Sequence, residues 1–311
     1  MNRSPLFLSL VCILLLFASC HARPAEEGND AIQVSPAIPG LSPISCRSLP
    51  ESFHYDNYTV VDRTVFLQGS GDTGPSFFCI DLDADEKTEI ALPVPGAVMD
   101  LSPSGGGSCL ACVYSSRLDG SLTARGYFTL FEIGPDAAAV RQVELTGIDK
   151  INLLAIGSPT VNGCAWIGER ILIIVNNRVI LLDEAGEFLD CLVWDSGHPR
   201  MACSSSKGVY VYDASSDGVT VKLLTVSEND ALSVSDLTLP GSAVGVIPSC
   251  GGTELYIADE KMVYSYDIET ARQKAVWVFP YGFSKEKEYR FDGRSTLLEC
   301  YHGRIGFFGL P

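Results

Sequence analysis

The sequence of 311 residues is poor in charge, since Asp, Glu, Lys and Arg together make up only 19% of it, against about a quarter in typical globular chains. Positive charge is scarcest, with 22 Lys and Arg against 38 Asp and Glu, which gives a net charge of −16. Phosphate binding needs Lys and Arg to displace counterions. Nucleic acid is therefore excluded as a main partner, and so is adhesion to anionic lipid headgroups by surface charge.

Helical periodicity is also missing. No stretch shows a convincing 3.6-residue spacing of apolar residues, so helices are expected to be incidental. Glycine is frequent, with 29 residues, and hydrophobic residues make up 46% of the chain. This composition excludes global disorder and favours many short strands joined by turns.

The usual catalytic motifs are absent: the chain has no G-x-S-x-G and no H-E-x-x-H sequence. Cys109 and Cys112 form a C-x-x-C motif, but no second pair exists to complete a zinc site. In a strand these two side chains point to opposite faces, so we predict that both pack in the core. We predict no catalytic residue, no metal and no cofactor.

Alternating carboxylates at 81–85 (DLDAD) resemble the start of a calcium loop. Glu86 stands where that loop needs glycine, and Leu92 stands where it needs a bidentate glutamate. We therefore expect a polar hairpin turn after an apolar strand.

The first 20 residues have the layout of an export signal. An apolar run of 12 residues, 6–17, follows Arg3. It is too short for a bilayer span of about 20 residues but suits a signal peptide. It ends in Phe17-Ala18-Ser19-Cys20, which resembles the bacterial lipobox. This resemblance implies a signal peptide at 1–19 and lipid attachment at Cys20. The protein is then exported and anchored to the outer side of the bacterial membrane. The alternative is an ordinary signal peptide with Cys20 incidental.

Eleven cysteines are present. Cys12 is lost with the signal peptide and Cys20 is lipidated, which leaves nine, an odd number that cannot all pair within one chain. Most of them lie in apolar strand patterns, as do Cys79 and Cys191. Since a free cysteine behaves as a small buried hydrophobe, we expect buried thiols.

Residues 20–50 form the second region, rich in proline, and are expected to be an extended tether. Its one strand-like piece is AIQVS at 31–35. From 51 to 311 the chain is a succession of short β-branched or aromatic runs that group in fours. The groups begin with the runs 58–62, 98–104, 151–157, 200–206, 242–248 and 288–292.

The groups repeat every 41 to 51 residues, as measured between the ends of their third strands. Repeats of this length with four strands each are typical of β-propeller blades. The last group supplies only three strands, ending with RIGFFG at 304–309. We therefore predict an all-β fold of six four-stranded blades, closed by an N-terminal strand at 31–35 that pairs with 304–309. The alternative is an unfinished sixth blade.

Two blades carry a more specific pattern, in which Asp183 is followed by Trp194 and Asp267 by Trp277. The pattern resembles the repeat of pyrroloquinoline-quinone-type propellers, and the resemblance implies that each Trp docks from the outer strand against the neighbouring blade. Other blades look closer to WD-like repeats. The whole layout resembles two lipoprotein families: the propeller lipoprotein of the outer-membrane assembly machinery, and clostridial surface lipoproteins whose N-terminal propeller precedes a solute-binding domain.

In an up-and-down propeller, the loops from second to third strands and from blade to blade emerge on one face. Because binding residues gather on loops held by a rigid scaffold, we predict a partner-binding rim there. Its candidate residues are Asp72, Arg117, Asp119, His198, Asp217, Tyr281, Lys285 and His302.

The functional prediction is a non-catalytic, lipid-anchored, extracytoplasmic binding or scaffolding module with a protein, peptide or glycan partner. The first alternative is an extracellular propeller hydrolase or lyase, which should show carboxylates or histidines with shifted pKa values in the central channel. The second alternative is the propeller part of a solute-binding transport lipoprotein.

Overall fold

Antiparallel strands make up almost all of the regular structure in the computed structural model. The described residues are 42–48, 54–71, 74–84, 86–118, 124–151, 159–195, 197–205, 208–215, 218–239, 243–249, 254–267, 270, 272–279, 282–284, 287–292, 296–301 and 304–309. Within them, the only helical segments are two short 3₁₀ turns, η1 (Gly105–Gly107) and η2 (Thr146–Ile151). No helix in this part of the chain has the length and apolar character needed to cross a membrane.

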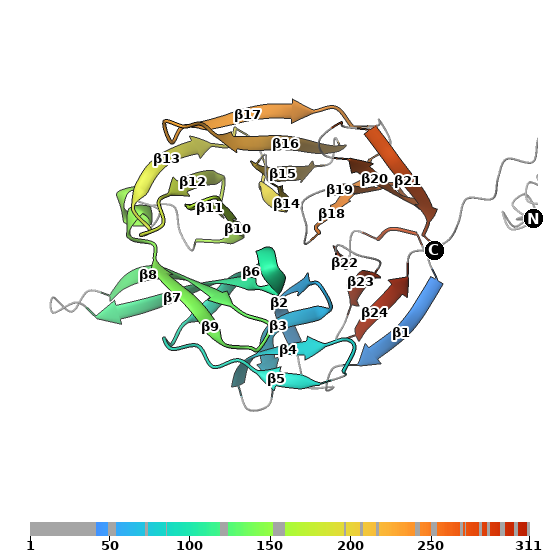
Figure 1. The fold of residues 1–311 in the computed structure, drawn as a ribbon, viewed down its shortest axis with the longest axis horizontal. Coiled ribbons are helices and arrows are strands. Elements are labelled where there is room, and N and C mark those ends of the chain that lie inside the picture. Colours follow the sequence, from blue (N-terminus) through green and yellow to red (C-terminus); the bar gives the residue numbers. More distant parts are fainter. Residues whose placement is uncertain are drawn as a thin grey trace, which may run out of the picture. The chain divides into compact units, whose positions relative to one another are not determined.

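Six four-stranded sheets are arranged around a common centre (Figure 1), so the fold is a six-bladed β-propeller, as predicted. Blade 1 comprises β2 (His54–Val61), β3 (Thr64–Gly71), β4 (Gly74–Asp81) and β5 (Lys87–Glu89). Blade 2 comprises β6 (Ala97–Pro103), β7 (Cys109–Leu118), β8 (Ala124–Ile133) and β9 (Ala139–Glu144). Blade 3 comprises β10 (Val161–Ile167), β11 (Arg170–Val175), β12 (Arg178–Leu182) and β13 (Phe188–Val193).

The remaining blades follow the same order, with the first strand of each nearest the centre of the ring. Blade 4 comprises β14 (Arg200–Ser205), β15 (Gly208–Ser215), β16 (Gly218–Val226) and β17 (Leu232–Leu237). Blade 5 comprises β18 (Gly245–Ile247), β19 (Glu254–Ala258), β20 (Met262–Asp267) and β21 (Arg272–Val278). Blade 6 comprises β22 (Glu288–Phe291), β23 (Thr296–Tyr301), β24 (Arg304–Gly309) and the N-terminal β1 (Ser42–Ser48).

The ring is closed by an N-terminal strand, but not by the segment expected from the sequence. β1 pairs with β24 from Ser42–Gly309 to Ser48–Arg304, and β23 occupies the other edge of β24. The predicted pairing of 31–35 with 304–309 is therefore wrong, and 31–35 lies outside the described residues. Pro43 made the true strand look like tether, yet β1 is the outermost strand of its blade, where proline is tolerated.

The first strand of blade 3 was also misplaced. The sequence predicted it at 151–157, whereas β10 spans Val161–Ile167 and most of 151–157 lies outside the described residues. Asn162-Gly163 looks like a hairpin turn, but here it forms a bulge opposite β11, with Gly163 at a φ of 147°. A Cβ on Gly163 would lie 2.5 Å from Cβ of Met201 in blade 4. Glycine is therefore required because two blades meet there.

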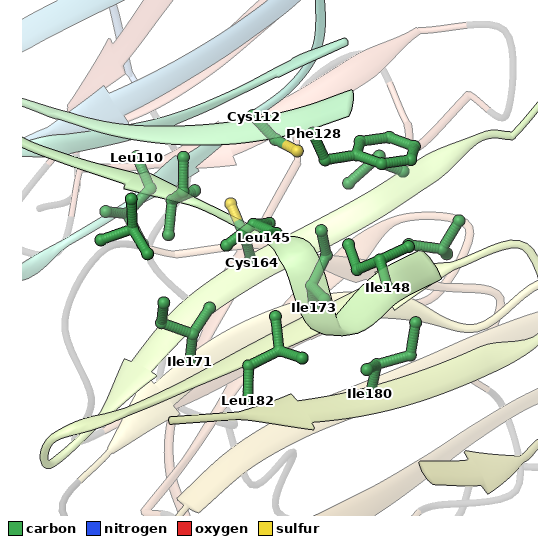
Figure 2. Close-up of a cluster of buried hydrophobic side chains, with 14 residues drawn as sticks. Leu110, Cys112, Phe128, Leu145, Ile148, Cys164, Ile171, Ile173, Ile180 and Leu182 are labelled. Atoms are coloured by element: carbon green, nitrogen blue, oxygen red, sulfur yellow. The ribbon is translucent and has the colours of Figure 1, made fainter. Parts of the chain in front are cut away.

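The hydrophobic core lies between neighbouring blades. Figure 2 shows the cluster between blades 2 and 3, where Leu110 and Cys112 of β7 face Ile171 and Ile173 of β11. All four side chains are fully buried, and each large one contributes about 1.5–3 kcal/mol. A single blade cannot bury both of its faces alone, so this contact is what holds the ring together.

The two tryptophans dock as the repeat resemblance implies. Trp194 packs in a buried cluster with Val209 and Leu224 of blade 4. Trp277 packs with Tyr289 and Leu297 of blade 6. In each case the outer strand of one blade reaches the next, and this prediction is confirmed.

The cysteine and turn predictions also hold where the structure describes them. Cys109 and Cys112 are buried in two different clusters, on opposite faces of β7. Six of the nine remaining cysteines are described as free thiols: Cys79, Cys109, Cys112, Cys164, Cys191 and Cys203. Asp81 forms the polar turn, because its Oδ1 accepts hydrogen bonds from the backbone N–H groups of Asp83 (2.7 Å) and Ala84 (2.9 Å).

Candidate functional site

The innermost strands surround a cavity of about 230 Å³ on the axis of the ring. Every blade contributes to its lining, through β2, β6, β10, β14, β22 and the residues that follow β18. The polar lining residues are Asn57, Thr59, Asp100, Ser102, Thr160, Asn162, Arg200, Tyr212, Ser249, Glu288 and Arg290. The cavity is therefore a polar compartment surrounded by six apolar interfaces.

The cavity wall is shaped by bulges at the same place in four inner strands. The extra residues are Asp56 in β2, Met99 in β6, Asn162 in β10 and Ala202 in β14. Bulges re-aim side chains and are over-represented next to functional sites. Here Met99, Asn162 and Ala202 line the cavity. The repeated bulge thus places one extra residue of three inner strands in the cavity wall.

Neighbouring inner strands are linked directly. Asn57 Nδ2 of blade 1 donates to the Val98 carbonyl of blade 2 at 3.2 Å. The Ser249 N–H donates to the Ala202 carbonyl at 3.0 Å, and the Phe291 N–H donates to the Pro248 carbonyl at 2.9 Å. These hydrogen bonds join blades 1 and 2, 4 and 5, and 5 and 6, so the wall of the cavity is rigid.

Asp100 of β6 is the carboxylate held most tightly in this wall. The Ser102 hydroxyl donates to Asp100 Oδ2 at 2.5 Å, and the Cys164 thiol donates to the same oxygen at 3.7 Å. The backbone N–H of Cys164 donates in turn to Ser102 Oγ at 3.0 Å. This network joins blades 2 and 3. Burial raises the pKa of Asp100, although the hydrogen bond from Ser102 and the charge of Arg290 oppose the shift.

Arg290 of β22 provides a positive charge in the cavity. It donates from Nη1 to the Tyr289 carbonyl at 3.0 Å, and its guanidinium carbon lies 4.9 Å from the centre of the Tyr58 ring. Burial is the largest influence and lowers the pKa of Arg290. The negative forms of Tyr58, Glu288, Tyr212 and Asp100 together outweigh burial, so this pKa lies above its ordinary value. Arg290 therefore stays charged.

A second arginine, Arg200, begins β14 and is paired in register with Tyr212 of β15. Its side chain lines the cavity and is exposed. Among the described residues, neither Arg200 nor Arg290 has a carboxylate within the 4.0 Å of an ion pair. Glu288 also lines the cavity and is exposed. The cavity thus holds two guanidinium groups that form no ion pair within the described part of the chain, and two carboxyl groups.

The thiols in the wall are poor nucleophiles. Burial and the nearby Asp100 raise the pKa of Cys164 well above its ordinary value. Burial also raises the pKa of Cys203 to about 12. Since only the thiolate is nucleophilic, both cysteines serve as packing groups.

Of the predicted rim, only His198 is fully described. Its side chain is exposed, and its backbone N–H donates to Oδ1 of the buried Asp213 at 3.2 Å. His198 lies two residues before Arg200, so this loop leads into the cavity. The backbone of Arg117 belongs to β7, but its side chain is outside the described residues. Also outside them are Cys20, Asp72, Asp119, Asp217, Tyr281, Lys285 and His302. All these positions stay predictions.

The cavity residues were missed by sequence reasoning. Asp100 and Arg290 lie within the segments VMDLSPS and EYRFD, which were interpreted only as strands. A charged residue inside an inner strand is the signal that could have found them, because charges are rarely buried without a purpose or a partner.

No protein-family model and no curated protein matches the chain. Solved structures do. The β-propeller domain of Cps50 (Swd1) from Myceliophteria thermophila is 12% identical, with 85% of this chain and 99% of that chain covered and a TM-score of 0.50. A chain of the mitotic checkpoint complex is 12% identical, with 94% and 99% covered and a TM-score of 0.50. Virginiamycin B lyase from Staphylococcus aureus is 14% identical, with 86% and 99% covered and a TM-score of 0.46. These likenesses show the fold alone.

Proposed function

We propose that this chain is a non-catalytic binding module that presents a propeller face and its axial cavity to a protein, peptide or glycan partner. The observation that supports the proposal is the composition of the cavity wall. Its polar groups are guanidinium, carboxyl, amide and hydroxyl groups on strands held by hydrogen bonds between blades. Such groups bind ligands by charge and hydrogen bonding. A propeller of similar fold belongs to the mitotic checkpoint complex, which is consistent with a scaffolding role.

The second part of the proposal concerns location. An apolar run followed by Phe17-Ala18-Ser19-Cys20 supports export and lipid attachment at Cys20. The cavity would then face the outside of the bacterial cell, at the end of a tether.

One observation favours a second candidate function, an extracellular hydrolase or lyase. Asp100 is a carboxyl group in the axial cavity with a raised pKa, and such groups serve as general acids in many enzymes. Its Oδ2 already accepts hydrogen bonds from Ser102 and Cys164. This arrangement supports a structural role for Asp100 between two blades, and we therefore prefer binding.

Arrays of immobilised peptides and glycans, probed with the purified protein, test the choice between binding and catalysis. We expect retention of one ligand class, with the ligand recovered intact after prolonged incubation. Cleavage of the ligand, abolished by Asp100→Asn while retention persists, would establish the enzyme instead. Absence of retention on every array would contradict the binding proposal.

Metabolic labelling with a radioactive fatty acid in a bacterial host tests the anchor. We expect label on the wild-type protein and partition into the detergent phase of Triton X-114, with both lost in Cys20→Ser. Cys12→Ser, in the apolar run that precedes Cys20, is the matched control and should retain the label. Equal labelling of Cys20→Ser and the wild type would rule out Cys20 as the anchor.

A further inference from the structure

We propose that the axial cavity binds a small ligand through a carboxylate group, which Arg290 holds and Arg200 assists. The inference deepens the proposed binding function, on which it rests, by assigning the chemistry of the ligand. Both arginines line one cavity of about 230 Å³, although they lie far apart in the sequence, in β14 of blade 4 and β22 of blade 6.

Arg290 has hydrogen-bond donors left for a ligand. A guanidinium has five N–H donors in a planar fork, and Arg290 uses one nitrogen, Nη1, for the Tyr289 carbonyl. The ring of Tyr58 beneath the guanidinium, at 4.9 Å, orients the planar group. No described carboxylate lies within 4.0 Å of Arg290, so none of them occupies its remaining donors. A carboxylate from a ligand satisfies the remaining fork with two parallel hydrogen bonds.

Two basic side chains line the same cavity in an acidic protein. The whole chain has a net charge of −16, yet two of its 22 basic residues line this cavity. They share it with Asp100 and Glu288, so the formal charges of the cavity balance, and a ligand carboxylate is recognised by hydrogen bonds from the guanidinium groups. Asp100 accepts hydrogen bonds at Oδ2 from Ser102 and Cys164, whereas Arg290 keeps donors for a ligand. A carboxylate that reaches the cavity therefore finds its donors on the arginines.

The two carboxyl groups of the cavity act against anions of high charge. Glu288 lies two residues before Arg290 in β22 and lines the same cavity as Asp100. Like charges repel, and both groups repel a doubly charged phosphate more strongly than a singly charged carboxylate. The cavity volume of about 230 Å³ limits the part of the ligand inside to a small organic acid or the end of a larger molecule.

Calorimetric titration of the full chain with propionate, propionamide and inorganic phosphate tests the inference. We expect propionate to bind at least tenfold more tightly than propionamide, its neutral isostere, and phosphate to bind more weakly than propionate. Arg290→Gln should weaken propionate binding at least tenfold. Arg200→Gln, at an exposed side chain that folding tolerates, should weaken it severalfold. Arg272→Gln removes the same charge from β21, outside the cavity, and should leave binding unchanged.

Three outcomes would overturn the inference: equal affinity for propionate and propionamide, tightest binding by phosphate, or full propionate affinity in Arg200→Gln and folded Arg290→Gln. The array experiment separates this failure from failure of the proposed function. If a partner is retained on the arrays but propionate neither binds nor competes, the binding function is supported and the carboxylate site is refuted. If propionate binds while no array ligand is retained, the carboxylate site is supported and the proposed protein, peptide or glycan partner is refuted.

Discussion

Arg63 Nη1 lies 3.5 Å from Oδ2 of Asp292, so the first and last blades of the ring are joined by an ion pair. Asp292 follows β22 and its side chain is fully buried, whereas Arg63 lies in the turn between β2 and β3. Arg63 also donates from Nη1 to Thr296 Oγ1 at 2.8 Å. The seam of the propeller is thus closed twice, by the β1–β24 pairing and by this contact.

Arg63→Ala should lower the free energy of unfolding by about 3 kcal/mol, since removal of one partner leaves a buried carboxylate uncompensated. Urea denaturation measures the change. Arg170→Ala is the matched control, because Arg170 of blade 3 pairs with Asp230 of blade 4 where both side chains are partly exposed, and it should cost less than about 1 kcal/mol. Adding Asp292→Asn to Arg63→Ala should recover part of the loss. Equal effects of the two arginine substitutions would contradict the clamp.

Gly163→Ala should destabilise the protein by about 1–3 kcal/mol through overpacking, because the new Cβ would meet Cβ of Met201 at 2.5 Å. Gly218→Ala is the control. Gly218 has a similar φ of 130°, and a Cβ added to it would meet nothing within 4 Å, so this substitution carries the backbone strain without the clash. The difference between their thermal unfolding midpoints isolates the contact between blades 3 and 4. No difference would mean that the blades can separate there at no cost.

Asp100 should make stability fall as pH rises. Because its pKa is raised in the folded state, the folded protein holds the proton more tightly than the unfolded chain does. Its contribution is complete below the unfolded carboxyl pKa, about 3.9, and is lost as pH rises through the folded value. Asp100→Asn should remove this part of the pH dependence in urea denaturation measured at a series of pH values. Asp81→Asn should instead remove a rise of stability with pH, since the pKa of Asp81 is lowered by the hydrogen bonds from Ala84 and Asp83. A steeper loss with pH in Asp100→Asn than in the wild type would refute the assignment.

Trp194→Ala should cost about 3–5 kcal/mol, because a large side chain is removed from the interface between blades 3 and 4. Val193→Ala changes the preceding residue, which is 52% exposed, and should cost no more than about 0.5 kcal/mol. Chemical denaturation of both variants provides the measurement. Comparable losses would show that the docking of Trp194 contributes little to the ring.

The local features of this fold could be predicted from the sequence. Runs of alternating residues, turns such as the one at Asp81, and a repeat of 41 to 51 residues depend on neighbours in the chain. They were enough to predict six four-stranded blades, whereas the docking of Trp194 and Trp277 was implied by the resemblance to pyrroloquinoline-quinone-type repeats. The placement of Cys109 and Cys112 on opposite faces of β7 follows from the same alternation, because residues three apart in a strand face opposite sides.

Features that depend on contacts between blades were determined only by the tertiary structure. β1 closes the ring instead of 31–35 because pairing with the free edge of β24 selects one of two strand-like segments. The pair Asn162-Gly163 lies inside β10, and Gly163 is required there because Met201 of the next blade leaves no room for a side chain. Asp100, Arg200 and Arg290 share a cavity because six inner strands converge on one axis. A local pattern specifies each strand, but only the closed ring determines which side chains meet at its centre.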